Sequence, residues 1–142
     1  MLSPAERSFY GVLQHSVSQL NQGGTQYLLF AKVRIADVLE PDHRKGTKGW
    51  LRAFGRISQK HFDFVLCDAK TLAPVLSIEL DDKSHRSNKA KARDNLVNDA
   101  CECAQLPLVR FPAKRGYQRN EVEFALRQAL SPSASEQPQL AN

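Results

Sequence analysis

The sequence predicts a mixed α/β (α+β) fold, in which a four-stranded mixed sheet is flanked by helices. Three strand-like apolar runs precede a long helical pattern, a fourth run follows it, and helical patterns stand at both ends of the domain. Consecutive strands favour an antiparallel meander, and a helical crossover favours a fourth strand added in parallel. The expected element order is α-β-β-β-α-β-α, in a single domain over residues 1–130.

The first helix is predicted by its cap and by its apolar spacing. Ser3-Pro4-Ala5-Glu6 offers Ser as N-cap, Pro at the first helical position and Glu three residues after the cap. Apolar residues then recur at helical spacing until the Gly23-Gly24 pair, namely Phe9, Leu13, Val17 and Leu20. Glu6 lies on the buried edge of this helix. Its first expected role is to close the capping box, and its second is to support an active site.

The next elements are three strands and a basic segment. Residues 27–33 form the first strand, and residues 47–57 are expected to be partly helical despite three glycines nearby. Residues 61–68 and the run that starts at Val75 form a hairpin around the loop 69–73. A long helix is expected over residues 87–105, a short strand over 108–111 and a last helix over 120–130. The tail 131–142, rich in Ser, Pro, Gln and Ala, is expected to be disordered.

The hairpin carries carboxylates in otherwise apolar strands. If Asp68 and Pro74 close the loop, counting back places Asp63 directly opposite Glu79, with Cβ atoms about 5 Å apart. Two like charges there repel unless a cation lies between them or one is protonated. Strand alternation puts Asp81 on the same face as Glu79, so three acids are expected to converge on a hard-cation site. The alternative is a pair of satisfied structural acids.

The net charge of +5 and the pI near 9.3 suggest an anionic partner. Basic residues gather between His43 and Lys60 with no acid among them, and Trp50 and Phe54 are interleaved; they include Arg44, Lys45, Lys48, Arg52 and Arg56. This segment is either a phosphate-contacting surface or a solvated face. Both interpretations stay open at this stage.

The cysteines and the hydropathy pattern indicate a cytoplasmic protein. Cys67, Cys101 and Cys103 are odd in number and contain no Cys-x-x-Cys pair, which argues against both a disulfide framework and a zinc site. Reduced thiols fit the cytosol. The N-terminus is too polar for a signal peptide, and no apolar run is long enough to span a membrane.

At this point the residues resemble a known group. The element order, with Asp63-Phe64 on the second strand and Ile78-Glu79-Leu80-Asp81-Asp82-Lys83-Ser84-His85 on and after the third, resembles the PD-(D/E)xK nuclease superfamily, in its very-short-patch-repair-like branch. Residues 2–111 are most similar to a bacterial domain-of-unknown-function family, number 2726. The resemblance implies a restriction-endonuclease-like core and a Mg²⁺- or Mn²⁺-dependent endonuclease.

The resemblance also assigns residue roles. Asp63 and Glu79 would be the metal ligands, helped by the backbone carbonyl of Leu80. The usual superfamily Lys, two residues after the Glu, is Asp81 here. Its task would pass to Lys83 or to His85, whose imidazole titrates near neutrality and suits a general base.

Several basic residues are candidates for nucleic-acid binding. Arg93 is placed by helical spacing on the buried face of its helix, where it would pair with Asp63 or Glu79 or clamp the nucleic-acid backbone. The other candidates are Lys32, Lys48, Arg52 and Arg56. His61 shares the Asp63 face and is either a pocket residue or a satisfied core histidine.

The function expected from these features is hydrolysis of phosphodiester bonds in nucleic acid, DNA rather than RNA. The alternative is a catalytically weak or inactive nuclease-fold module that binds nucleic acid or a partner protein. A homodimer is left open, and no membrane association is expected.

Overall fold

The computed structural model describes residues 1–39, 48–81 and 87–131. Its elements, in chain order, are α1 (Pro4–Leu20), the 3-10 turn η1 (Asn21–Gly23), β1 (Tyr27–Arg34), α2 (Ile35–Val38), α3 (Lys48–Ile57), β2 (His61–Asp68), β3 (Pro74–Asp81), α4 (Asn88–Cys103), β4 (Leu108–Pro112) and α5 (Arg119–Leu130). The predicted order is confirmed, and the short elements η1 and α2 are additions to it. Predicted residues Arg44, Lys45, Lys83 and His85 and the tail from residue 132 lie outside the described residues.

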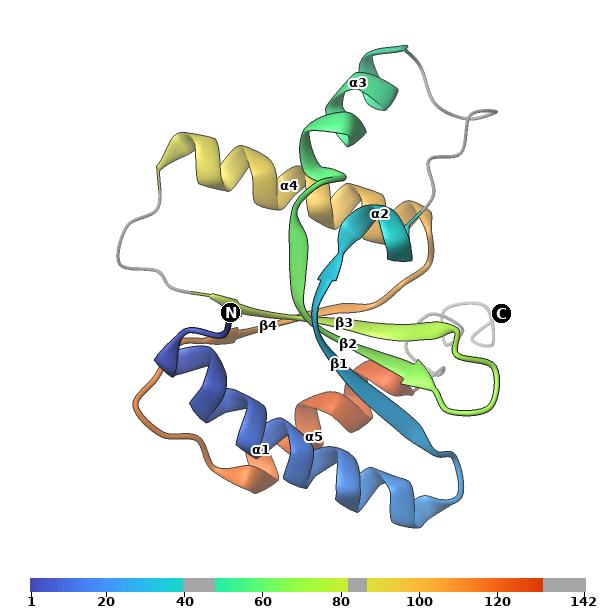
Figure 1. The fold of residues 1–142 in the computed structure, drawn as a ribbon, viewed down its shortest axis with the longest axis vertical. Helices are drawn as coiled ribbons and strands as arrows, with labels where there is room; N and C mark the ends of the chain where they lie inside the picture. The colour runs from blue at the N-terminus through green and yellow to red at the C-terminus, as the bar shows by residue number, and fades with distance from the viewer. Residues whose placement is uncertain (40–47, 82–86, 132–142) are drawn as a thin grey trace, which may run out of the picture.

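The four strands form one mixed sheet in the order β1-β2-β3-β4 (Figure 1). β1 and β2 pair antiparallel, as do β2 and β3, whereas β4 joins β3 in parallel. The parallel strand follows the crossover helix α4, as expected from the rule that parallel neighbours need a long connection. The predicted four-stranded mixed sheet flanked by helices is therefore confirmed.

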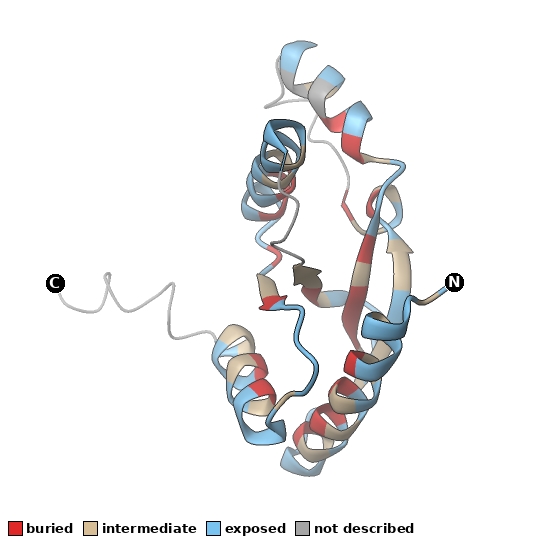
Figure 2. Ribbon diagram, turned by 90° about the vertical axis from the view of Figure 1, so that its left-hand side faces the viewer, coloured by how far each residue is buried: buried red, intermediate tan, exposed pale blue. Residues whose placement is uncertain are grey.

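Helices cover both faces of the sheet. α1 and α5 lie on one side, and α2, α3 and α4 lie on the other (Figure 1). Buried residues of the helices and strands lie on the sides that face one another, and exposed residues face outward (Figure 2). Among the described residues, no helix is long and apolar enough to span a membrane.

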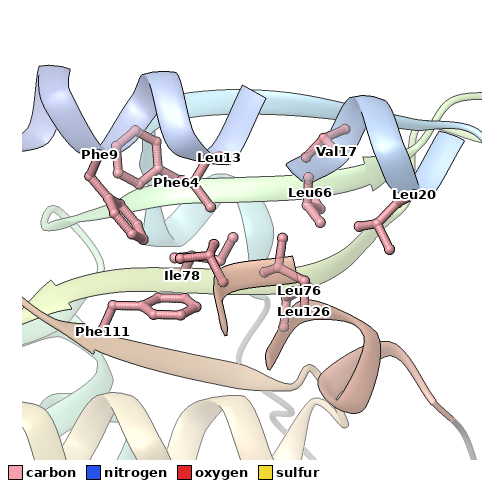
Figure 3. Close-up of a cluster of buried hydrophobic side chains, with 11 residues drawn as sticks. Phe9, Leu13, Val17, Leu20, Phe64, Leu66, Leu76, Ile78, Phe111 and Leu126 are labelled. Carbon is pink, nitrogen blue, oxygen red and sulfur yellow. The ribbon is translucent and has the colours of Figure 1, made fainter. Parts of the chain in front are cut away.

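The first core lies between the sheet and the helices α1 and α5 (Figure 3). Phe9 of α1 is fully buried, with its ring centroid 5.0 Å from that of Phe111 and 5.9 Å from that of Phe64. Leu13, Val17 and Leu20 continue the buried stripe predicted for this helix. α1 is thereby fixed on the sheet, and its first turn reaches the site described below.

The second core lies under α3 and α4. α4 buries Val97, Ala100 and Cys101, which share one face of the helix at spacings of three and four residues. Cys103 and Ala104 would continue this stripe by spacing, but they are exposed, because α4 ends at Cys103 and Ala104 is its C-cap. Ile57 and Phe62 complete the cluster from α3 and β2.

The register of the hairpin agrees with the prediction at Asp63 and Glu79 but not at the loop. Pairing of Phe64 with Ile78 sets the register, and extending it by one residue places Asp63 opposite Glu79. The predicted closing pair was wrong: Cys67, not Asp68, pairs with Pro74, and a bulge between Leu66 and Cys67 absorbs the shift. A bulge of this kind adds one residue to one strand, and sequence alternation alone does not reveal it.

Candidate functional site

Asp63 is held by contacts with both neighbouring strands. Its carboxylate Oδ2 accepts a hydrogen bond of 2.8 Å from the Leu80 backbone N–H of β3. Its Oδ1 lies 3.4 Å from the Lys32 ammonium of β1, and the side chain is only 14% exposed. The backbone ladder between β2 and β3 ends at the pair Phe64 and Ile78, so the Asp63 side chain takes the Leu80 N–H just beyond it. The carboxylate is therefore fixed in orientation.

Glu79 is a mostly buried carboxyl beside Asp63. Burial raises the pKa of Glu79 to about 8, with further contributions from the charge of Asp63 and from a hydrogen bond between the two side chains, while Arg110 and Arg93 oppose the shift. At neutral pH and without a cation, Glu79 carries a proton and donates it to the Asp63 carboxylate. The two acids thus share one proton in a place where two charges cannot coexist unpaired.

Lys32 stands opposite Asp63 in an unusual backbone conformation. Its φ is 54°, in the left-handed region, within an otherwise extended strand. Near Lys32, β1 changes the core that its side chains contact. Leu29 packs against the first core and Val33 against the second, although simple alternation puts both on one face of the strand. Phe64 and Phe62 of β2 are divided between the cores in the same way.

This conformation has a cost that its ion pairs do not offset. A left-handed non-glycine residue costs about 1–3 kcal/mol. The Lys32 side chain is 32% exposed, and ion pairs that solvent reaches contribute about 0–1 kcal/mol. Strained residues of this type cluster at functional sites, where the surrounding structure holds them in place. The packing of β1 against both cores therefore holds Lys32 in this conformation, beside the site.

Glu6 divides its two carboxylate oxygens between the two roles expected for it. Oε2 accepts the Ser3 backbone N–H at 3.0 Å, while the Ser3 hydroxyl accepts the Glu6 N–H at 3.1 Å, which completes the capping box. Oε1 lies 2.8 Å from the Lys32 ammonium. Burial would raise the pKa of Glu6, but hydrogen bonds from Lys32 and Ser3 outweigh it and lower that pKa. The capping role is confirmed, and the same side chain reaches the site.

Glu6 and Asp63 in turn raise the pKa of Lys32. Burial would lower the pKa of Lys32, but the hydrogen bond to Glu6 and the charge of Asp63 outweigh burial and raise it. Lys32 therefore stays charged through the physiological range, which suits an electrostatic role and not that of a general base.

These residues line one cleft of about 360 Å³. It is built by the first turn of α1, the strands β1 to β3 and the first half of α4. Its acids are Glu6, Asp63, Glu79 and Asp94, and its cationic side chains are Lys32, Lys60 and Arg93. His61 also lines it, with an exposed side chain, so it is not the satisfied core histidine that was the alternative.

The expected convergence of three acids was wrong. Asp81 is not among the residues that line the cleft, and no group of three or more His, Cys, Asp or Glu side chains in the described parts of the chain is placed to share a metal ion. Two residues along a strand span about 7 Å. β3 remains paired with β4 as far as Asp81 and Pro112, whereas its pairing with β2 ends at Ile78, so Asp81 follows β4.

The remaining pair still fits a hard divalent cation. Mg²⁺ is bound in proteins through one or two carboxylates and keeps several waters, so Asp63 and Glu79 are a sufficient protein contribution. Zinc, which takes three or four protein ligands, does not fit the described side chains. A buried proton shared by two carboxyls is also what a cation would replace. At Leu80 the structure shows the amide N–H engaged with Asp63; the carbonyl's role as a ligand stays a prediction.

Comparison with known proteins gives one match. The sequence model of a family described as Protein of unknown function (DUF2726) matches residues 1–130. The chain belongs to the DUF2726 family. No curated protein and no solved structure matches it. The predicted resemblance to family number 2726 is confirmed, whereas the resemblance to the PD-(D/E)xK superfamily stays a prediction; the match includes all the elements from α1 to α5.

Arg93 of this DUF2726 domain is not where helical spacing placed it. Its side chain is 52% exposed, and its guanidinium lies 3.4 Å from the Asp94 carboxylate. The buried stripe of α4 begins at Val97, one turn later, so Arg93 lies at the open end of that face and lines the cleft instead of the core. Its charge nevertheless lowers the pKa of Glu79.

A second, basic groove adjoins the cleft of the DUF2726 domain. It has a volume of about 550 Å³, lies between α3 and α4, and shares Lys60 and Arg93 with the cleft. Arg56 and Lys89 add two further cations, and Ile57 and Leu96 supply apolar walls. Of the predicted nucleic-acid residues on α3, only Arg56 lines this groove. Lys48 and Arg52 are exposed on the same helix, and they line neither the groove nor the cleft.

Sequence reasoning missed two contributors to the site. Arg110 pairs with Glu79 in the parallel ladder of β3 and β4, donates to the Asp94 carbonyl and to the Asn98 side chain, and lowers the pKa of Glu79. Asp94 lines the cleft beside it. A charged residue inside the apolar strand Leu108–Pro112 was the one available signal for Arg110.

Proposed function

We propose that this DUF2726 domain is a Mg²⁺- or Mn²⁺-dependent endonuclease that hydrolyses phosphodiester bonds, in DNA rather than RNA. The proposal includes a restriction-endonuclease-like core of the PD-(D/E)xK superfamily, in its very-short-patch-repair-like branch. The observation that carries it is the partly buried, hydrogen-bonded pair Asp63 and Glu79, which faces an open cleft edged by cationic side chains.

The acid pair supports a cation site more than a structural one. Burying a carboxyl group costs free energy unless a partner compensates for it. Here the partner of Glu79 is a second carboxyl, and the two line a cleft open to solvent instead of a sealed core. A divalent cation replaces the shared proton and pairs both charges at once. Asp63, oriented by the Leu80 N–H, and Glu79 would hold it.

The chemistry follows from that placement. A cation bound there would polarise a phosphate oxygen and lower the pKa of a nearby water. The protein's own residues would fix the carboxylates and supply positive charge around the phosphate. The resemblance assigns water activation to Lys83 or His85, and this remains part of the proposal, outside the described residues.

The basic groove supports nucleic acid as the substrate. Lys60 and Arg93 line both hollows, and Arg56 and Lys89 continue the positive surface away from the acids. Phosphate contacts by Lys and Arg dominate the affinity of proteins for nucleic acid. No acid is among the described residues that line the groove, so a backbone that enters along it would reach the acid pair past these cations.

The test is cleavage of plasmid and single-stranded DNA in Mg²⁺ or Mn²⁺ by the wild type, Asp63→Asn and Glu79→Gln. We expect metal-dependent cleavage that falls at least 100-fold in both variants, because each loses one cation-binding charge. Asp99→Asn, an exposed acid of α4, is the matched control and should cleave like the wild type. Cleavage that persists in both site variants would defeat the assignment.

A second function is a nuclease-fold module that binds nucleic acid without cutting it. The observation that favours it is Asp81, which stands where the superfamily has a lysine and lies outside the cleft. Fluorescence anisotropy with labelled DNA, in EDTA and in Ca²⁺, separates the two. DNA affinity that is high and equal in EDTA and in Ca²⁺, with no cleavage in any metal, would favour the binding module.

A further inference from the structure

We propose that Lys32 is a catalytic residue, whose ammonium contacts the phosphate being cleaved, and that Glu6 is the residue that positions it. This inference rests on the proposed nuclease function. Lys32 is the cationic side chain whose charged atom lies 3.4 Å from Asp63, and it comes from β1 instead of the strand that carries Glu79.

The geometry places the ammonium next to the cation position. An atom 3.4 Å from one Asp63 oxygen is within reach of a phosphate oxygen that shares a cation with that carboxylate. An ammonium has three N–H donors. In the present arrangement one contact is to Glu6 and one is to Asp63. A cation bound by Asp63 would compete for the second contact, and the N–H donor that Lys32 now gives to Asp63 would then be available to the phosphate.

Glu6 keeps Lys32 in place through that change. One of its oxygens holds the ammonium at 2.8 Å, and the other is itself fixed by the Ser3 N–H at the start of α1. The left-handed backbone at Lys32 sets the strand geometry from which the side chain reaches both acids. The contacts of Lys32 with Glu6 and Asp63 thus join residues far apart in the sequence, on α1, β1 and β2.

The hydrolytic step needs such a charge. A water oxygen forms a bond to phosphorus, and the bond from phosphorus to the leaving strand's oxygen breaks. The water's proton passes to a base, and the leaving oxygen takes a proton from solvent. Negative charge increases on the non-bridging oxygens in between, and a cation already placed there stabilises it without reorganisation. Asp81 has the wrong sign for this role.

The experiment compares Lys32→Met, Lys32→Arg and Glu6→Gln with the wild type. Lys70→Met, an exposed lysine of the hairpin loop, is the matched control. Three quantities are measured: the single-turnover cleavage rate in saturating Mn²⁺, the Mn²⁺ affinity by isothermal titration calorimetry, and the DNA affinity in Ca²⁺. Thermal unfolding checks that each variant is folded.

We expect Lys32→Met to lose at least 100-fold in cleavage rate and less than tenfold in DNA affinity. Its Mn²⁺ affinity should be unchanged or several-fold higher, because a cation that competes for Asp63 has been removed. Lys32→Arg should recover part of the rate. Glu6→Gln should lose about tenfold, and it provides the test if Lys32→Met does not fold.

Two results would overturn the inference while the nuclease function stands. The first is cleavage by Lys32→Met within threefold of the wild type, when Asp63→Asn and Glu79→Gln have lost it. The second is a Mn²⁺ affinity at least tenfold weaker in Lys32→Met, which would make Lys32 a support of the metal ligands. Absence of metal-dependent cleavage by the wild type would defeat the function and the inference together.

Discussion

At the scale of single residues, the site depends on a proton shared by two carboxyls. Glu79 is raised to a pKa of about 8 by burial and by Asp63, and it therefore holds a proton at neutral pH unless a cation replaces it. Asp63 is held in place by the Leu80 N–H and by the Lys32 ammonium. One acid is thus poised to exchange its proton for a cation, and the other is fixed.

The first prediction concerns the stability of the metal-free protein against pH. The pKa of Glu79 rises from an ordinary 4.5 to about 8 on folding, so between these values the folded state keeps a proton that the unfolded state has lost. Glu79 therefore stabilises the fold fully below pH 4.5, and this contribution is lost as the pH rises to 8. The slope is at most about 1.4 kcal/mol per pH unit.

Urea unfolding in EDTA at several pH values measures this slope. Glu79→Gln removes the titrating group, so its stability should fall less than that of the wild type across the same window. Equal slopes for the two proteins would show that Glu79 titrates normally in the folded state.

At the scale of elements, the start of α1 joins a helix cap to the site. The Ser3 hydroxyl accepts the Glu6 N–H, and the Ser3 N–H in turn holds one Glu6 oxygen, while the other oxygen holds Lys32. On β1, Lys32 has a left-handed backbone. Near this residue, the side chains of β1 and β2 pass from contacts with one core to contacts with the other. Local capping and long-range placement thus depend on the same side chain.

A prediction at this scale separates the capping role of this side chain from its role in the site. Ser3→Ala removes the hydroxyl but keeps the backbone N–H that binds Glu6, so we expect a loss of about 0.5–2 kcal/mol in the free energy of unfolding. Mn²⁺ affinity should stay within threefold of the wild type. Urea unfolding and calorimetry measure the two, and Ser18→Ala, at an exposed position of the same helix, is the control. A large loss of Mn²⁺ affinity would mean that the cap itself positions the metal ligands.

At the scale of the whole molecule, the sheet separates two cores and leaves the site at the edge of one of them. α1 and α5 close one face, and on the other the basic groove lies between α3 and α4. The cleft adjoins that groove and is lined by the first turn of α1, the strands β1 to β3 and the first half of α4. The predicted strand order and the flanking helices are confirmed. The buried position of Arg93 and the third acid of the cluster were wrong, because spacing along one element does not say where that element's packing ends.

The groove gives a prediction at this scale. Arg56→Glu combined with Lys89→Glu should weaken DNA binding in Ca²⁺ at least tenfold and lower the slope of log affinity against log salt by about 2, since two phosphate contacts are lost. Fluorescence anisotropy between 50 and 200 mM salt, the range in which such contacts act strongly, measures both quantities. Lys70→Glu with Lys114→Glu makes the same change of charge elsewhere and should lower the affinity by less than threefold. Equal losses in the two double variants would show that net charge alone attracts the DNA.

The sequence by itself determined the elements and the opposition of Asp63 and Glu79. Caps, apolar spacing and a short hairpin loop act between neighbours in the chain, and residues close in sequence have few ways to pair. Only the tertiary structure decided that Glu6 and Lys32 join Asp63, that Arg110 reaches Glu79, and that Asp81 leaves them. These outcomes follow from sheet pairing, strand divergence and a left-handed residue. They couple segments that are distant along the chain, and no local periodicity encodes them.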